Sequence, residues 1–320
     1  MIDRKLARGL SRIGVRATYG QALYELGQAN DSIVAMSADL GRSSGLNQFS
    51  LNLPKQFVNV GISEQNMIGV AAGMASQGKI VFASSFAPFI SMRASEQVRM
   101  NLGYMKWPVK LVALGSGVAM AFLGNSHFGL EDVAVMRAIP GMTIVSPADC
   151  VEVKKVLEAA VEWDGPMYIR LTGAVNAPIV YQDEYNFEIG KADILREGEV
   201  TIVATGTSVA LALSVAKMFE EQMNLNVGVI NMHTIKPLDL KCLEKVFNTS
   251  SLVVSLEEHT IIGGLGSAIS DAYAEHGWKS KFAKIGLPDK YVPTGEYSYV
   301  LDEVGLNSES VFKSIKKLLG

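Results

Sequence analysis

The sequence predicts an α/β protein with two doubly wound domains, each with a largely parallel sheet covered by helices. Short apolar segments alternate with helical patterns along the whole chain. The length of 320 residues exceeds that of most single domains. An irregular polar stretch interrupts the alternation at residues 176–189. We therefore expect one domain at residues 1–185 and a second at 186–320.

The first domain is expected to hold six short apolar strands with helices between them. Turn residues bound these segments, such as Asp39-Leu40-Gly41 after the first one. We expect the strands at residues 33–36, 57–60, 80–83, 109–113, 142–145 and 167–171. The helical patterns fall at residues 17–29, 64–76, 88–102 and 149–162. This alternation predicts parallel strands that are buried on both faces of the sheet.

The second domain repeats the alternation with fewer elements. Strands are expected at residues 200–204, 227–230, 252–255 and 282–285, and the last helix at 308–319. The glycine run Gly263-Gly264-Leu265-Gly266-Ser267 lacks the full Gly-x-Gly-x-x-Gly spacing of a dinucleotide site. We therefore interpret this run as a close backbone turn that leads into a helix at 266–276.

Composition and charge argue against several classes of function. The 29 basic and 32 acidic residues give a net charge of −3 without long blocks, so nothing indicates nucleic acid or an anionic membrane as partner. Cys150 and Cys242 are too few for a disulfide framework and fit a reducing cytosol. The chain shows no apolar run of roughly 18 to 20 residues and no apolar secretory core at its start. We expect a soluble, cytoplasmic protein with small molecules and proteins as partners.

A carboxylate stands at an expected junction between strand and helix. Glu64 follows the strand at 57–60 and begins a helix of small residues, Gly69-Val70-Ala71-Ala72-Gly73-Met74-Ala75, which permits close packing. Its residue type and position leave two interpretations open. Glu64 complements the positive end of the helix, with Ser63 as the N-cap, or it is a functional acid at a strand end.

Two aromatic residues and one histidine are the next candidates. Phe86 and Phe89 can share one face of a turn or helix start, on which a flat ring could stack. The alternative is that both belong to the core. His127 lies near the end of the glycine-bearing segment 115–129, which leaves a strand end, where ligands bind in open parallel sheets. The alternative for His127 is a hydrogen-bonded structural role.

Taken together, these segments resemble the pyrimidine-binding domain of transketolases in order and spacing. The segments that carry the resemblance are Ser37-Ala38-Asp39-Leu40, Gly61-Ile62-Ser63-Glu64-Gln65-Asn66, Ser85-Phe86-Ala87-Pro88-Phe89, Gly124-Asn125-Ser126-His127 and Ser146-Pro147-Ala148-Asp149. Later segments resemble the C-terminal domain of transketolases and deoxyxylulose-phosphate synthases, namely Val254-Ser255-Leu256-Glu257-Glu258-His259, Gly263-Gly264-Leu265-Gly266-Ser267 and Ile285-Gly286-Leu287-Pro288-Asp289. The resemblance covers about residues 15–320.

The resemblance implies thiamine diphosphate as cofactor and gives roles to individual residues. Glu64 would hydrogen-bond a pyrimidine ring nitrogen and favour the imino tautomer, whose nitrogen removes the thiazolium C2 proton. His127 would contact the reacting end of the sugar and move protons, so the expected catalytic residues are Glu64 and His127. The expected cofactor contacts are Asp39, Leu40, Ile62, Glu64, Phe86 and Phe89. The expected substrate contacts are Ser43, Arg93, His127 and Arg170.

A second chain is expected because part of the family's cofactor site is missing here. The amino-terminal half of the family carries Gly-Asp-Gly and a downstream Asn, which bind magnesium and diphosphate, whereas this sequence has no Gly-Asp-Gly. We find no cluster of oxygen ligands that replaces it and expect no metal site in this chain. The resemblance therefore implies an N-terminal transketolase subunit that holds the diphosphate with Mg²⁺ (or Ca²⁺), in an α2β2 heterotetramer built round a β2 core.

Several positions depart from the pattern of the family. Tyr19 stands where many transketolases have Arg, and two phosphate-contacting positions fall on Gly115 and Gly173. An acidic substrate contact of the family falls near Leu123. Nearby alternatives at shifted positions are Arg93 and Arg170. Because Arg is suited to bidentate phosphate binding, these departures favour a modified, unphosphorylated or differently charged sugar over an ordinary pentose phosphate.

The function that the resemblance implies is transfer of a two-carbon ketol unit between sugars or sugar phosphates, with the thiazolium as electron sink. Two enzymatic alternatives share the same two-domain plan. They are the β subunit of a 2-oxo acid dehydrogenase and a deoxyxylulose-phosphate-synthase-like enzyme. A third alternative is a half that acts only as a non-catalytic scaffold.

Overall fold

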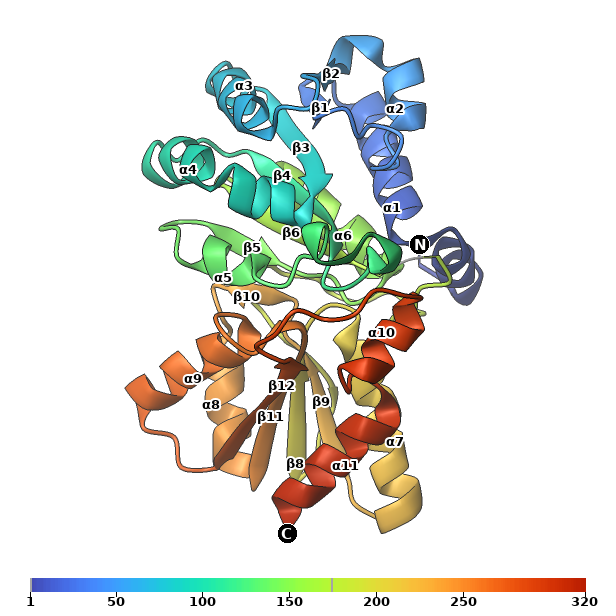
Figure 1. Ribbon diagram of the computed structural model, residues 1–320, viewed down its shortest axis with the longest axis vertical. Coiled ribbons are helices and arrows are strands. Elements are labelled where there is room, and N and C mark those ends of the chain that lie inside the picture. Colours follow the sequence, from blue (N-terminus) through green and yellow to red (C-terminus); the bar gives the residue numbers. More distant parts are fainter. Residues whose placement is uncertain (1, 174) are drawn as a thin grey trace.

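The computed structural model describes residues 2–173 and 175–320, which form two α/β units (Figure 1). The first unit, drawn from blue to green, lies above the second, drawn from yellow to red. Each unit is a mostly parallel sheet covered by helices, which confirms the predicted fold class. The exact domain boundary at residues 185 and 186 stays a prediction.

The first sheet has seven strands in the order β10-β5-β6-β4-β3-β1-β2. Six of them are β1 (Ile33–Ser37), β2 (Phe57–Asn59), β3 (Ile80–Phe86), β4 (Lys110–Ser116), β5 (Thr143–Val145) and β6 (Met167–Thr172). These six pair in parallel. The strands β1 and β4 are buried along their whole length, as expected for mainly apolar strands of a parallel sheet that is covered on both faces.

The second sheet has five strands in the order β12-β11-β8-β9-β7. They are β7 (Asp193–Arg196), β8 (Val200–Ala204), β9 (Val227–Asn231), β11 (Leu252–Thr260) and β12 (Lys281–Leu287). Strand β7 runs antiparallel to β9, and the other neighbours are parallel. The sequence does not predict β7, because this half-exposed edge strand has no buried apolar run.

Helices connect the strands in both units. The first unit contains α1 (Arg4–Ala29), α2 (Asn47–Asn52), α3 (Glu64–Ser76), α4 (Ser95–Val98), α5 (Asp132–Arg137) and α6 (Cys150–Glu162). The second contains α7 (Ser208–Met223), α8 (Leu240–Thr249), α9 (Leu265–His276), α10 (Tyr297–Glu303) and α11 (Ser308–Leu319). Short 3₁₀ helices are η1 (Pro54–Gln56) and η4 (Ala121–Ser126), and π-helical segments are η2 (Phe89–Arg93) and η3 (Arg99–Tyr104).

Two helices differ from those predicted. The helix expected at 17–29 already begins at Arg4, where the Asp3 carboxylate accepts the Leu6 N–H at 2.7 Å. A kink at Gly14 separates these early turns from the predicted part of the helix. The helix expected at 88–102 is divided into η2, α4 and η3. These wider π turns change which side chains share a face, and periodicity of 3.6 does not reveal them.

The helices divide between the two faces of the first sheet. Buried residues of α3, α4 and α5, among them Met67, Val98 and Val133, pack on one face. Helices α1 and α6 pack on the other face. Their core continues without interruption to Val209 of α7 and Phe312 of α11. One apolar core therefore joins the two units.

A short strand that follows β9 along the chain completes the first sheet. Strand β10 (Thr234–Lys236) pairs antiparallel with β5. Ile235 is buried in the core cluster of α3, α4 and α5. The Lys236 ammonium donates to the carbonyl oxygens of Arg137 and Ile139 at 2.8 and 2.7 Å. A strand this short carries no recognisable period, so the sequence does not predict this exchange.

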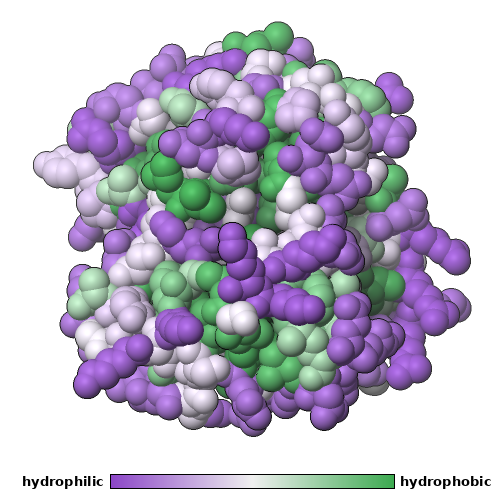
Figure 2. All heavy atoms as spheres, turned by 60° about the horizontal axis from the view of Figure 1, so that its bottom comes forward, coloured by the Kyte–Doolittle hydropathy of each residue, from purple (hydrophilic) through white to green (hydrophobic). Residues whose placement is uncertain are grey.

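The face shown in Figure 2 is largely hydrophilic, with hydrophobic residues gathered in separate patches between the polar ones. Large apolar side chains that are exposed include Ile62, Phe122 and Leu123. Within the described residues, each helix is too short or too polar to cross a membrane.

Candidate functional site

The predicted site residues gather at the carboxyl ends of β1, β3 and β4, which are neighbours in the sheet. Asp39 and Leu40 follow β1, and Phe86 ends β3. His127 directly follows η4 in the segment after β4, and Glu64 begins α3 after β2. Because the strands are parallel, these segments meet at one edge of the sheet, where ligands usually bind in such folds.

The Glu64 carboxylate is only 2% exposed and is oriented by side chains of β3 and η2. The Ser85 hydroxyl donates to Oε1 at 3.4 Å, and Nη1 of Arg93 donates to Oε2 at 2.9 Å. Ser63 occupies the N-cap position, but its hydroxyl donates to the Val60 carbonyl and forms no capping bond. Ser63 is thus the N-cap residue, as expected, but it caps the helix by position and not through its side chain.

Phe86, Phe89 and His127 form a triangle of rings that meet edge to face. The ring centres of Phe86 and Phe89 are 6.0 Å apart, as are those of Phe86 and His127. The rings of Phe89 and His127 are 5.2 Å apart. Phe86 is buried, whereas Phe89 and His127 are half-buried. Nδ1 of His127 lies 2.9 Å from the Ser126 hydroxyl, which leaves Nε2 as the ring nitrogen for other partners.

Arg93 connects the acid to this triangle. Its guanidinium carbon lies 4.0 Å from the centre of the Phe89 ring while Nη1 contacts Glu64. The Arg93 carbonyl accepts from Nε2 of Gln65 at 3.2 Å. We call the contiguous group the Glu64 site, which consists of Glu64, Phe86, Phe89, Arg93 and His127. The sequence predicts all five members, but it does not predict that Arg93 covers Glu64 and Phe89.

The remaining predicted contacts lie on two neighbouring loops. The Asp39 N–H donates to Oδ1 of Asn59 at 2.9 Å, and Nδ2 of Asn59 donates to the Asp39 carboxylate at 3.4 Å. These bonds tie the loop after β1 to the loop after β2. Leu40 is half-buried, Ser43 is exposed and Ile62 is 79% exposed. As cofactor or substrate contacts, Asp39, Leu40, Ser43 and Ile62 stay predictions.

Arg170 is buried in a different setting. Its guanidinium forms an ion pair with Asp132, with donor–acceptor distances of 2.9 to 3.2 Å. It also donates to the Thr172 hydroxyl at 3.1 Å and to the carbonyl oxygens of Gly129 and Glu258 at 3.1 and 3.0 Å. This geometry disfavours the predicted contact between Arg170 and substrate, because the donors are already bound to groups of the two domains.

The segment that carries His127 is fastened to the second domain. Oε1 of Glu258 accepts the Val118 N–H at 2.8 Å. Gly117 allows this approach, since a Cβ at this position would lie 2.3 Å from the same oxygen. Nδ2 of Asn125 donates to the Val292 carbonyl at 2.9 Å. The sequence does not predict these anchors, although a carboxylate within an apolar strand is the signal that Glu258 offers.

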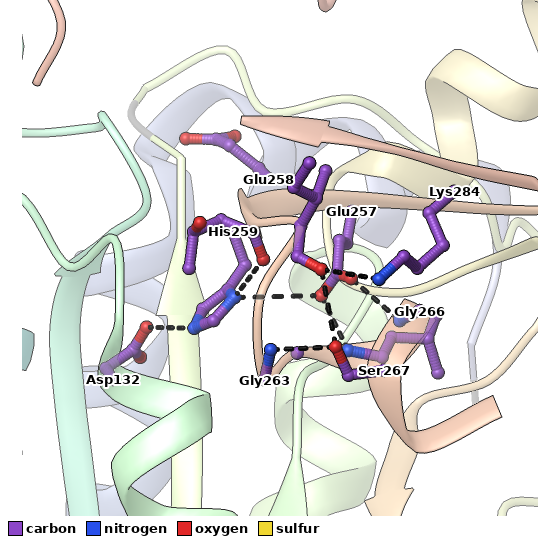
Figure 3. Close-up of polar contacts among 12 residues, drawn as sticks. Asp132, Glu257, Glu258, His259, Gly263, Gly266, Ser267 and Lys284 are labelled. Carbon is purple, nitrogen blue, oxygen red and sulfur yellow. Dashed lines mark hydrogen bonds and ion pairs between the residues drawn. The ribbon is translucent and has the colours of Figure 1, made fainter. Parts of the chain in front are cut away.

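Figure 3 shows the buried polar cluster beside this junction. Glu257 accepts the N–H groups of Leu265 and Gly266 at 2.7 and 2.8 Å, at the start of α9. Nε2 of His259 lies 3.8 Å from Oδ1 of Asp132. Burial raises the pKa of Glu257 to about 7 and lowers the pKa of His259 to about 4, because it penalises both charged forms. These contacts join β11 to α9 and α5, so we assign the cluster to domain structure.

The positions that depart from the family's phosphate pattern are glycines in the left-handed region. Gly115 has φ 64° and Gly173 has φ 96°. A Cβ at Gly115 would lie 2.4 Å from the Met120 sulfur, so the neighbouring side chain fills this space. Neither position offers a side chain to an anion. Among residues 2–173 and 175–320, no group of three or more His, Cys, Asp or Glu side chains could hold a metal ion.

Comparison with known proteins identifies the family. Residues 11–174 match the model of the transketolase pyrimidine binding domain, and residues 190–311 match the transketolase C-terminal domain. The chain therefore belongs to the transketolase family and corresponds to these two of its domains.

Relatives of similar length define the comparison further. The chain is 41% identical over 305 residues to a putative transketolase C-terminal section of Methanocaldococcus jannaschii, which covers 94% of this chain and 95% of the relative. It is 38% identical over 303 residues to a 6-deoxy-6-sulfo-D-fructose transketolase subunit of Clostridium sp., with coverages of 94% and 92%. A solved structure described as a split gene transketolase, inactive beta4 tetramer, superposes with a TM-score of 0.85 at 40% identity and covers 95% of this chain and 97% of that one. These matches confirm the resemblance to C-terminal halves of split transketolases.

Proposed function

We propose that the chain is the C-terminal subunit of a split transketolase and that, with a separate N-terminal subunit, it transfers a two-carbon ketol unit between sugars. The observation that supports this most directly is the Glu64 site. The buried Glu64 carboxylate pairs with Arg93, whose guanidinium lies over the half-buried ring of Phe89, and His127 lies against the same ring. An acid, a stacking surface and a proton carrier are thereby gathered at one strand edge.

The Glu64 site suits the aminopyrimidine ring of thiamine diphosphate. A flat polar ring needs an aromatic surface and an acid that hydrogen-bonds its ring nitrogen. Phe89, with Phe86 beside it, offers the surface, and Glu64 offers the acid. For the metal ion of the diphosphate, the described residues offer no group of three or more His, Cys, Asp or Glu side chains. We assign only the ring's part of the cofactor site to this chain.

The residues of this chain have distinct roles in the proposal. Thiamine diphosphate, when bound, supplies an electron sink for the carbon–carbon bond that is broken and formed. Glu64 holds a proton at a carboxyl oxygen and donates it in a hydrogen bond to the pyrimidine nitrogen. Ser85 orients this group through its hydroxyl. Nε2 of His127, on the side of the ring away from Ser126, moves a proton to or from the sugar.

The partner in this proposal is an N-terminal subunit that binds the diphosphate together with Mg²⁺ (or Ca²⁺). We propose an α2β2 heterotetramer round a β2 core, located in the cytoplasm. Relatives of this length are described as a section and a subunit of transketolases, which supports a missing half. The related structure that contains β chains alone is described as inactive. That description agrees with a site that one type of chain cannot complete.

The substrate in this proposal is a sugar or sugar phosphate, and the site favours a terminal group other than that of an ordinary pentose phosphate. Gly115 and Gly173 offer no side chain to a phosphate group, and Arg170 is committed to Asp132. The relative from Clostridium is named for a sulfonated fructose, which supports a sugar with a different anionic end.

The proposal is tested by reconstitution with an N-terminal subunit that carries Gly-Asp-Gly and the downstream Asn. The mixture receives thiamine diphosphate, Mg²⁺ and either a ketose donor with an aldose acceptor or pyruvate. We expect ketol transfer that requires both chains. Turnover of pyruvate alone would reject the transketolase assignment in favour of a 2-oxo acid dehydrogenase or a synthase. If the N-terminal subunit without this chain is as active as the reconstituted pair, this chain is a non-catalytic scaffold.

A further inference from the structure

Arg93 already contacts both residues that the cofactor ring would need. Nη1 of Arg93 donates to Oε2 of Glu64 at 2.9 Å, and its guanidinium carbon lies 4.0 Å from the centre of the Phe89 ring. We infer that Arg93 competes with the aminopyrimidine ring of thiamine diphosphate for Glu64 and Phe89. Its side chain therefore has to leave before the ring can bind. This inference rests on the proposed function of the Glu64 site.

The guanidinium and the aminopyrimidine share the features that this site can recognise. Both groups are planar, both stack on an aromatic face, and both carry N–H donors that suit a carboxylate. Phe86 and His127 meet the Phe89 ring edge to face, at interplanar angles of 60° and 64°. The guanidinium instead lies over the ring. Two planar groups cannot share that position at stacking distance.

The two groups need the Glu64 carboxyl group in different protonation states. Oε1 faces the Ser85 hydroxyl at 3.4 Å, and Oε2 accepts from Arg93. A guanidinium has only donors, so it requires Glu64 as an acceptor. The proposed contact with the pyrimidine nitrogen requires Glu64 as a donor. A protonated carboxyl keeps one accepting oxygen but is a weaker acceptor for a guanidinium than a carboxylate, so the two arrangements compete.

Arg93 is able to leave without a change in the backbone. Its side chain is 47% exposed, whereas that of Glu64 is 2% exposed. Arg93 ends η2, and its carbonyl oxygen is separately held by Gln65. The long apolar stem of an arginine lets the head turn toward water while the backbone stays in place. The predicted contact between Arg93 and substrate would then be made by the Arg93 side chain after it has left Glu64 and Phe89.

Competition of this kind lowers the apparent affinity for the cofactor. When only a fraction of molecules has the binding-competent arrangement, the apparent Kd is the intrinsic Kd divided by that fraction. Removal of the competing group raises the fraction to near one. A variant that lacks the Arg93 guanidinium should consequently bind the cofactor more tightly, although it has lost a residue of the site.

The experiment measures thiamine diphosphate binding to the reconstituted pair of subunits by isothermal titration calorimetry in the presence of Mg²⁺. For Arg93→Met, which keeps a flexible apolar stem, we expect Kd to fall about tenfold, equal to about 1.4 kcal/mol. Arg93→Lys should give an intermediate Kd, because an ammonium keeps the charge but does not stack as a plane. The matched control is Arg99→Met, since Arg99 pairs at 2.9 Å with the exposed Glu96 and should leave Kd unchanged.

A second background separates competition from other effects of the substitution. In Glu64→Gln, the neutral amide attracts the guanidinium less, so Arg93→Met should change Kd by a smaller factor than in the wild type. An unchanged or higher Kd for Arg93→Met and Arg93→Lys in the wild-type background overturns the inference while the proposed function stands. If neither the wild-type pair nor the Arg99→Met pair binds thiamine diphosphate, the proposed function is wrong, and the inference about Arg93 is wrong as well.

Discussion

Glu64 is placed by side chains from two other elements of the chain. Ser85 reaches its carboxylate from β3, and Arg93 reaches it from η2. Such partners are needed because a carboxylate that loses water without compensation is strongly destabilising. The acid therefore has a defined orientation, and Arg93 links it to the aromatic triangle of Phe86, Phe89 and His127. This arrangement is the basis of its proposed role.

Replacement of Glu64 tests that role. In the reconstituted pair, we expect Glu64→Gln to lower kcat by about 10² to 10⁴-fold, the usual contribution of a positioned acid or base. Steady-state kinetics with a ketose donor measure the effect. Glu96→Gln is the control, because Glu96 is exposed and pairs only with Arg99 among the described ion pairs. Equal kcat values for Glu64→Gln and the wild type would return Glu64 to a purely structural role.

Single residues also show which parts of the site a sequence can predict. Glu64, Phe86, Phe89 and His127 are predictable, because each belongs to a motif with recognisable order and spacing. Arg170 is not, because its partners Asp132 and the Glu258 carbonyl lie 38 and 88 residues away in sequence. An arginine in a strand has the same appearance in the sequence whether it meets a substrate or a buried aspartate. Long-range ion pairs of this type are visible only in the folded chain.

The π-helical segment η2 explains the arrangement at the level of elements. It holds Phe89 and Arg93 so that the guanidinium lies over the ring. The helix predicted at 88–102 assumes regular spacing, and the sequence gives no sign of the wider turns. By contrast, helices α3 and α11 begin and end where the pattern predicts, at 64–76 and 308–319. Regular amphipathic helices are thus predictable, whereas local irregularities that shape the site are not.

Strand β10 is one of the elements that tie the units together, beside the apolar core of α1, α6, α7 and α11, and Ile235 is its buried residue. We expect Ile235→Ala to lower the free energy of unfolding by about 2–5 kcal/mol, because a buried side chain is lost from the core of α3, α4 and α5. Both units should still unfold in one calorimetric transition. Ile194→Ala is the matched control, because Ile194 is exposed on the edge strand β7, and it should lower the free energy of unfolding much less. Two separate transitions in the wild type would contradict the linkage by β10.

At the scale of the whole molecule, both units hold the segment that carries His127 in place. The second unit holds this segment through Glu258 and through Val292, which bonds to Asn125. The apolar core that runs from α1 and α6 to α7 and α11 holds the two units in a fixed position relative to each other. The second domain therefore contributes to the site by position, although its own side chains lie outside the Glu64 site.

The junction between the units should also make stability depend on pH. Glu152 of α6 is fully buried and accepts from Asn231 of β9 at 2.9 Å. Burial raises its pKa from 4.5 to about 8. A carboxyl with a raised pKa contributes stability below pH 4.5 that is lost as the pH rises to about 8. Burial lowers the pKa of His233 and His259 from 6.5 to about 4, so their contribution is lost as the pH falls from 6.5 to 4.

Between pH 7 and 8 the two histidines are mostly neutral in both states, and Glu152 makes the largest change. Glu257, whose pKa burial raises to about 7, adds to the fall in stability, whereas Lys110, whose pKa burial lowers to about 8, opposes it. We predict that the free energy of unfolding falls in this range, by up to about 1.4 kcal/mol per pH unit for one proton. Urea unfolding at several pH values measures this slope. In Glu152→Gln, which has no titrating carboxyl at position 152, the free energy of unfolding should change less with pH. Identical slopes for the variant and the wild type would show that Glu152 does not control the dependence.

The central claim is that this chain offers an acid and a stacking surface to a cofactor ring whose diphosphate is held by another chain. Calorimetric titration of thiamine diphosphate with Mg²⁺ into the isolated chain and into the reconstituted pair tests it most directly. We predict binding heat for the reconstituted pair and none for the isolated chain, with one cofactor bound for each pair of chains. Equally tight binding to the isolated chain would contradict the division of the site between two chains.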